Sequence, residues 1–144
     1  MFLKVIAISL IALSFASSAA SPQTYGNIIV KEVRTIYDAD TFYITVEGWP
    51  DIIGKRMPIR ANGFDAPEIR GKCEKEKKLA QQAKQLTVQA LRQANTIELR
   101  NMMRGKYFRI IADVYIDGKP LKEIHFDAGT ARAYSGGKRE GWCD

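Results

Sequence analysis

Residues 28–46 read IIVKEVRTIYDADTFYITV, and this stretch sets the kind of fold that the chain can adopt. Ile28–Ile36 is rich in β-branched residues, and Thr41–Val46 alternates apolar with polar side chains at the two-residue period of a half-buried strand. Tyr37–Asp40 lies between them and is typical of a turn. The stretch therefore predicts a hairpin with Asp40 at the entrance to its second strand.

Beyond the hairpin, the pattern predicts three more strands and two helices. Arg56–Ala61 is a short extended run, and Glu74–Ala94 repeats its apolar residues at intervals of three and four, with acidic residues in the first turn, as in a long helix. Further strands are expected over Thr96–Met102 and Lys106–Ile116. Pro120–Ala128 fits a short helix that begins near a proline and ends before a glycine. Five strands interrupted by helices predict an α+β domain, a five-stranded Greek-key barrel of the OB type with about three helices.

The N-terminal segment differs in composition from the rest of the 144-residue chain, which has room for one domain. Residues 1–20 combine Lys4, an apolar run over Val5–Phe15 and small residues after it, as in a cleaved signal peptide. A membrane anchor is the alternative, but a span needs about 20 apolar residues, and serines interrupt this shorter run. We expect a signal peptide over residues 1–20 and a mature domain over residues 21–144. That domain would be periplasmic or secreted, with no membrane contact after cleavage.

The charge balance is basic. The chain carries 22 Lys and Arg against 16 Asp and Glu, a net charge of +6, and removal of residues 1–20 takes away only Lys4, which leaves +5. A basic domain favours a polyanionic partner such as nucleic acid, although a charge that serves only solubility gives the same number. The residues capable of chemistry must therefore identify the partner.

The two cysteines, Cys73 and Cys143, are an even count in a chain that we expect to be exported. An oxidising compartment favours a disulfide over a metal site. The bond would close a loop of about 70 residues and stabilise the fold by about 3 to 4 kcal/mol in the loop-entropy model. We therefore expect Cys73 to pair with Cys143 and to tie the C-terminal residues to the body of the domain.

The segment Arg60–Glu68 holds a basic residue and two acids, Asp65 and Glu68, around a proline-stiffened bend. Asp40 supplies a third carboxylate if the hairpin brings it alongside. Two aspartates and a backbone carbonyl, for which Ala66 is the candidate, leave positions in the oxygen shell of a hard cation open for water and a phosphate oxygen. This arrangement indicates a calcium or magnesium site in an enzyme of phosphoryl chemistry.

Two arginines and a glutamate supply the remaining chemistry of phosphodiester hydrolysis. The guanidiniums of Arg60 and Arg109 can stabilise the transition state with two-pronged hydrogen bonds, and Glu68 can act on the attacking water as a general base. Each of these residues also has a purely structural interpretation, as a surface charge or a strand residue. His125, the single histidine, lies in the short helix pattern away from these residues, and we interpret it as structural rather than as a nucleophile.

Taken together, these residues resemble the staphylococcal nuclease (thermonuclease) family, whose motifs they match in order and spacing over essentially the whole mature chain. The matching motifs are Asp38-Ala-Asp-Thr41, Arg60, Phe64-Asp-Ala-Pro-Glu68, Lys106-Tyr-Phe-Arg109, Asp117-Gly118 and Ala133-Tyr134. Two further features look like the exported Gram-negative branch of the family. They are Cys73, shortly after the Phe64–Glu68 motif, and the ending Gly136-Gly-Lys-Arg-Glu-Gly-Trp-Cys143.

The resemblance implies an OB-type barrel and calcium-dependent hydrolysis of DNA and RNA to 3′-phosphate products. By motif position, Asp40 and Asp65 are similar to the family's calcium carboxylates, and Ala66 is similar to its carbonyl ligand. Glu68 is similar to the family's general base, and Arg60 and Arg109 to its phosphate-binding arginines. Lys106 and Tyr107 are similar to the family's contacts with a neighbouring phosphate, and Tyr134 to a tyrosine of the nucleotide pocket. The alternative is a catalytically inactive OB-fold module that binds nucleic acid. The five catalytic and metal-binding side chains favour the enzyme, and we expect a monomer.

Overall fold

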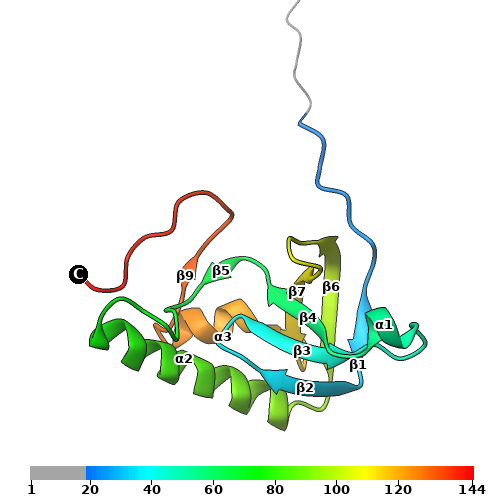
Figure 1. Cartoon of the computed structure of the whole chain (residues 1–144), viewed down its shortest axis with the longest axis horizontal. Coiled ribbons are helices and arrows are strands. Elements are labelled where there is room, and N and C mark those ends of the chain that lie inside the picture. The colour runs from blue at the N-terminus through cyan, green and yellow to red at the C-terminus, as the bar shows by residue number, and fades with distance from the viewer. Residues whose placement is uncertain (1–18) are drawn as a thin grey trace, which may run out of the picture.

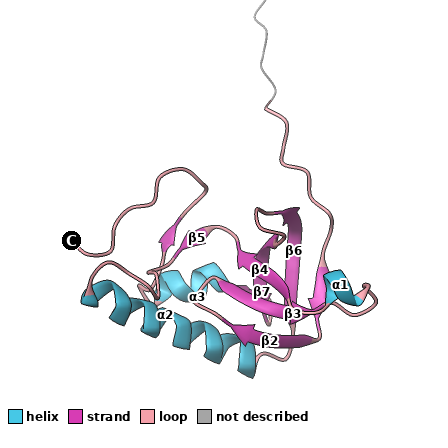
Figure 2. Cartoon of the chain, in the orientation of Figure 1, coloured by secondary structure: helices cyan, strands magenta, loops and turns pink. Residues whose placement is uncertain are grey.

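The computed structural model describes residues 19–144, so the signal peptide expected over residues 1–20 falls, apart from its last two residues, outside the described part and stays a prediction. Within residues 19–144, no helix is both long and apolar enough to cross a membrane. The helices and strands of this part are drawn in Figures 1 and 2. The strands are β1 (Ile28–Val30), β2 (Glu32–Ile36), β3 (Thr41–Thr45), β4 (Met57–Ala61), β5 (Phe64–Asp65), β6 (Ile97–Arg104), β7 (Ile110–Ile116), β8 (Lys119–Pro120) and β9 (Arg132–Ala133), and the helices are α1 (Asp51–Gly54), α2 (Glu74–Gln93) and α3 (Leu121–Asp127).

The main sheet is mixed and has the strand order β1-β6-β7-β4-β3-β2, with β8 paired to β7. Residues 28–36 form two strands rather than the single strand expected, because β1 pairs with β6 and β2 pairs with β3. Only Lys31 separates β1 from β2, so one extended stretch of chain lies at both ends of the sheet. The sheet is thereby curved into a half-barrel. The predicted fold class, an OB-type α+β domain with three helices, is confirmed.

The long helix α2 covers the sheet on the side of β2, as Figure 1 shows. It begins where expected, at Glu74, and ends one residue before the expected Ala94. Its N-cap is Cys73, whose sulfur accepts a hydrogen bond from the backbone N–H of Glu76. The face that packs on the sheet carries small residues such as Ala83, which is fully buried. The helix therefore lies close to the barrel and shields one side of its apolar core.

Two short segments differ from the sequence prediction. The helical turn α1 is not one of the two helices that the pattern predicts, because its four residues are too few to show a periodic pattern. The strand expected over Lys106–Ile116 begins only at Ile110, because Tyr107 and Phe108 adopt left-handed backbone φ values of 57° and 53°. Residues 105–109 form a loop that is closed by a hydrogen bond from Gly105 N to the Arg109 carbonyl, at 2.8 Å.

His125 of α3 is a core residue, as we interpreted it from the sequence. Its side chain is fully buried and its ring stacks on Phe64 with centroids 5.1 Å apart. The Thr87 hydroxyl donates to the Ala39 carbonyl at 2.7 Å, so it accepts from His125 Nε2 at 2.8 Å, and His125 Nδ1 accepts from the Thr130 hydroxyl at 2.7 Å. This neutral chain of hydrogen bonds ends at the Ala39 carbonyl and so supports the turn that carries Asp40.

The buried His125 imidazole should make the unfolding free energy of the protein depend on pH in the acidic range. Burial lowers its pKa from 6.5 to about 4. The unfolded chain binds more protons than the folded chain between these two pH values. The wild-type protein should therefore lose about 3 kcal/mol of unfolding free energy relative to His125→Gln as the pH falls from 7 to 4. Urea unfolding of both proteins across this range measures the difference, and parallel pH curves would contradict it.

Candidate active site

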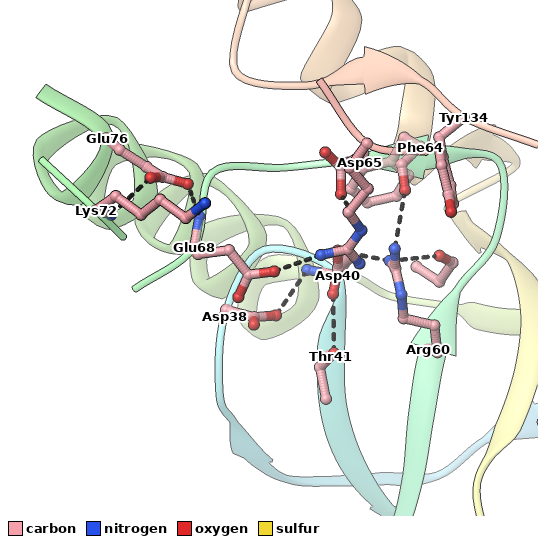
Figure 3. Close-up of polar contacts among 12 residues, drawn as sticks. Asp38, Asp40, Thr41, Arg60, Phe64, Asp65, Glu68, Lys72, Glu76 and Tyr134 are labelled. Atoms are coloured by element: carbon pink, nitrogen blue, oxygen red, sulfur yellow. Dashed lines mark hydrogen bonds and ion pairs between the residues drawn. The ribbon is translucent and has the colours of Figure 1, made fainter. Parts of the chain in front are cut away.

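The register of the central strands brings Asp40 and Arg60 together, since Thr41 of β3 lies opposite Arg60 of β4. The Arg60 guanidinium lies 2.6 Å from Asp40 Oδ2 and donates to the carbonyls of Ala61 at 3.0 Å and Phe64 at 3.3 Å. Figure 3 shows these contacts. Both side chains are nearly buried, so the arginine neutralises the aspartate and also braces the chain that leads to β5.

Asp40 sits at the end of a turn that is ordered by polar contacts. Its backbone N–H donates to Asp38 Oδ1 at 3.1 Å, and its Oδ1 accepts from the Thr41 hydroxyl at 2.8 Å. Burial raises the pKa of Asp40 to about 7, and the negative charge of Asp38 adds to this effect, while Arg60 and Thr41 oppose it. A carboxylate held in this way gains strongly from a nearby positive ion.

Asp65 enters the site from β5, the short strand that pairs with β9. Its Oδ1 is buried and accepts no hydrogen bond, although Arg139 Nε lies 3.1 Å away. Figure 3 shows Asp65 directed toward the same region as Asp40. A buried carboxylate oxygen without a hydrogen bond is costly unless a cation completes its environment. The Arg139 guanidinium supplies positive charge beside Asp65 Oδ1, and a metal ion bound to Asp65 would add to it.

Glu68 lies in the loop between β5 and α2, and Glu76 of α2 fixes this loop from behind. The buried Glu76 carboxylate accepts from the backbone N–H groups of Glu68 at 3.3 Å and Lys72 at 2.9 Å. The loop packs tightly against Glu76 here, because a Cβ on Gly71 would lie 2.5 Å from the Glu76 side chain. Figure 3 shows Glu76 and Glu68 on the two sides of this connection. The backbone of Glu68 is therefore held in one position while its own carboxylate faces the cleft.

Arg109 ends the loop between β6 and β7 and is half-buried. Its Nε is buried and donates no hydrogen bond. Because a guanidinium has five N–H donors in a fixed fork and Arg109 lines the cleft, its other N–H groups can bind an oxyanion there. Arg60 differs, since several of its donors are already used within the protein.

These side chains meet in a cleft of about 260 Å³. Five of the predicted site residues line it, and Asp65 lies buried beside it. The lining comprises Tyr37, Asp38, Asp40, Thr41, Tyr43, Arg60, Ala66, Pro67, Glu68, Arg109 and Arg139. The cleft thus combines acidic groups, arginines and tyrosines, the set that a phosphate ester and a hard cation would need together.

The three predicted substrate-binding residues all lie outside the lining of this cleft. Lys106 and Tyr107 occupy the exposed β6–β7 loop, where Tyr107 is 88% exposed. Tyr134 follows β9, and its hydroxyl donates to the Gly137 carbonyl at 2.8 Å. Their contacts with substrate remain predictions.

Several residues of the site were missed by sequence reasoning. Arg139 makes ion pairs with both Asp65 and Glu68. Asp38 is part of a matching motif, but the sequence predicts no role for it. Glu76 is predicted only as a favourable charge in the first turn of a helix. The signals available were weak, because all three are charged residues that are common on surfaces.

The predicted disulfide between Cys73 and Cys143 is present, with Cα atoms 5.9 Å apart. Cys73 precedes α2 and lies five residues after Glu68 in the sequence. The bond therefore joins the start of α2 to the last residues of the chain. Glu76 lies next to the two sulfur atoms. Because the sulfurs are bonded to each other, this group is a structural link and not a thiolate metal site.

Comparison with known proteins identifies the family of the chain. No curated protein matches the chain. The family described as "Staphylococcal nuclease homologue" matches residues 58–141, which include all of β4 but its first residue, the Glu68 loop, Arg109 and most of the C-terminal segment. Since this match extends over more than half of the 144 residues, the chain belongs to the staphylococcal nuclease homologue family.

Proposed function

We propose that the protein is a calcium-dependent nuclease that hydrolyses phosphodiester bonds of DNA and RNA to 3′-phosphate products. Membership of the staphylococcal nuclease family points to a nuclease-type hydrolase. The observation that carries the finer proposal is the cleft that gathers Asp40, Glu68, Arg60 and Arg109, with the Asp65 carboxylate buried beside it. A hard cation at the acids and a phosphate at the arginines would use these groups together.

The donor set fits calcium. Asp40, Asp65 and the Ala66 carbonyl are oxygen ligands, which hard cations prefer, and they leave positions of the oxygen shell open for water and substrate. When bound, calcium would polarise the phosphate oxygen and neutralise charge that develops on it. The buried Asp40, whose pKa is raised to about 7, would be held in its ionised form by that ion.

The other residues would act on the phosphodiester and on water. Arg109 would bind the phosphate through the N–H groups of its guanidinium at the cleft, and Arg60 would add positive charge while it keeps Asp40 in place. Glu68 would take the proton of the attacking water as the new P–O bond forms and the bond to the leaving 5′-oxygen breaks. Its fixed backbone supports this role.

The proposal includes export. The signal peptide over residues 1–20 and the disulfide Cys73–Cys143 both suit a periplasmic or secreted protein, because structural disulfides persist in oxidising compartments. A monomer with DNA and RNA as its partners is the form proposed.

The test is hydrolysis by the purified mature protein. We expect degradation of single-stranded DNA, duplex DNA and RNA with added calcium, loss of activity with a calcium chelator, and recovery when calcium is restored. End-group analysis should find 3′-phosphates. Equal degradation in chelator would refute the metal assignment. Binding of nucleic acid without any hydrolysis would instead identify the inactive OB-fold module.

A further inference from the structure

The C-terminal tail, residues 135–144, leaves the small sheet directly beside the site. β9 pairs with β5 so that Arg132 lies opposite Asp65. Immediately after β9 the chain turns back through Gly136 and Gly137, whose φ values of 111° and 89° favour glycine. Figure 1 shows the tail, in red, looping back toward the start of α2. The path of the backbone thus brings a late part of the sequence to the catalytic loop.

Three contacts hold the end of this tail, and two of them are made by Arg132. Cys143 is bonded to Cys73. Trp142 is only 9% exposed and lies under the Arg132 guanidinium, 3.8 Å from the ring centroid. Arg132 also donates to the Gly141 carbonyl at 2.7 Å. These contacts therefore fix residues 141–143 against the body of the domain.

The anchored tail presents Arg139 to the acids of the cleft. Arg139 Nε lies 3.1 Å from Asp65 Oδ1, and its Nη1 donates to Glu68 Oε1. The Asp65 side chain is 8% exposed, whereas the Glu68 side chain is 53% exposed, so the arginine links a fixed acid to a movable one. Arg139 also lines the cleft.

We propose that Arg139 is a positioning residue of this site, which holds the Glu68 carboxylate toward the cleft and is itself held by the disulfide-anchored tail. The inference rests on the proposed function. Without the guanidinium, the like charges of Asp65 and Glu68 repel each other and Glu68 is free to turn into solvent. A base displaced by about 1 Å can lose much of its rate advantage.

The same contact predicts an opposite effect on calcium. A guanidinium beside Asp65 repels a divalent cation that would bind there. Arg139 therefore weakens calcium binding while it favours turnover. A residue that served only the fold would affect both properties in the same direction, so the two measurements together distinguish positioning from simple support.

The experiment compares Arg139→Ala with the wild type. We expect kcat on single-stranded DNA to fall about 10-fold or more, the scale on which partners of catalytic ligands act, with KM little changed. Isothermal titration of calcium without nucleic acid should show binding at least about threefold tighter, because one repelling charge has been removed. Arg139→Lys should give an intermediate kcat and little change in calcium binding, since it keeps the charge but not the fork.

Two controls complete the design. Lys138→Ala removes the same charge from the adjacent, exposed position, and it should leave kcat and calcium binding unchanged. In Cys73→Ser/Cys143→Ser the tail is released, while serine keeps the N-cap acceptor of α2. This double variant should lose most of the same kcat, and adding Arg139→Ala should lower kcat little further, because both changes break one connection.

The outcomes separate the two proposals. An active wild type with unchanged or raised kcat in Arg139→Ala, or with weaker calcium binding in that variant, would overturn the positioning role alone. A wild type that neither binds calcium nor cleaves nucleic acid would overturn the proposed function, and the positioning role with it.

Discussion

Arg109→Ala should lower kcat at least about 100-fold, because it removes a donor that acts on charge developing in the transition state. Its buried Nε has no partner within the protein, so the substitution breaks no hydrogen bond made by that atom. The variant should therefore keep the wild-type unfolding free energy to within about 1 kcal/mol. Steady-state kinetics with urea unfolding of the same samples measures both effects.

The conservative variant makes the Arg109 prediction sharper. Arg109→Lys retains the charge, but an ammonium cannot form the two parallel hydrogen bonds of a guanidinium, so it should recover only a small part of the lost rate. Arg104→Ala is the matched control, because Arg104 belongs to the adjacent β6 and stacks near the Tyr25 ring, away from the cleft lining. Normal activity in Arg109→Ala would move the phosphate site elsewhere.

Arg60 is a less informative target, although it was predicted with the same role. Its guanidinium is buried against Asp40 at 2.6 Å. Removing one partner of a buried ion pair leaves an uncompensated charge and costs about 3 to 5 kcal/mol of stability. Lost activity in Arg60→Ala could thus report damage to the fold and to Asp40, whereas Arg109 isolates the contact with phosphate.

The parts of the fold that the sequence predicts correctly are those with a strong local pattern. The period of three and four over Glu74–Ala94 places α2 to within one residue. The alternation over Thr41–Val46 places β3 and puts Asp40 just before it. In both segments, local propensity and burial agree, so a single sequence is sufficient.

The errors arise where pairing or tertiary contacts decide the conformation. A β-branched run such as Ile28–Ile36 does not show that its halves pair with different strands. Likewise, Tyr107 and Phe108 favour strands by propensity, yet the return into β7 requires left-handed backbone at both positions. Local signals carry no information about either requirement.

The site shows the same division. The acids and arginines of the motifs could be assigned to one site from their spacing in the sequence. Asp40, Glu68, Arg60 and Arg109 do line one cleft. Arg139 could not be grouped with them, because its ion pair with Glu68 spans 71 positions and depends on the β5–β9 pairing and on the disulfide. Glu76 was missed for a related reason, since a sequence does not reveal that a helix carboxylate accepts backbone N–H groups from a preceding loop.

Glu68→Gln should also lower kcat at least about 100-fold, because glutamine can hold a water molecule but cannot take its proton. The substitution preserves the size of the side chain, and the Glu68 backbone stays fixed through Glu76. Calcium binding should persist in this variant, since Asp40 and Asp65 are unchanged. Titration calorimetry and single-turnover kinetics on the same preparation test these two expectations.

The comparison of two substitutions distinguishes the possible roles of Glu68. A residue that only orients water would tolerate glutamine better than the shorter aspartate, because glutamine still accepts a hydrogen bond at the same distance. A general base would show the reverse order, since aspartate can still accept a proton. Glu47→Gln, which removes a charge from an exposed ion pair with Lys31, is the control for the loss of one carboxylate. We expect aspartate to retain more activity than glutamine, because aspartate can still take the proton of the attacking water.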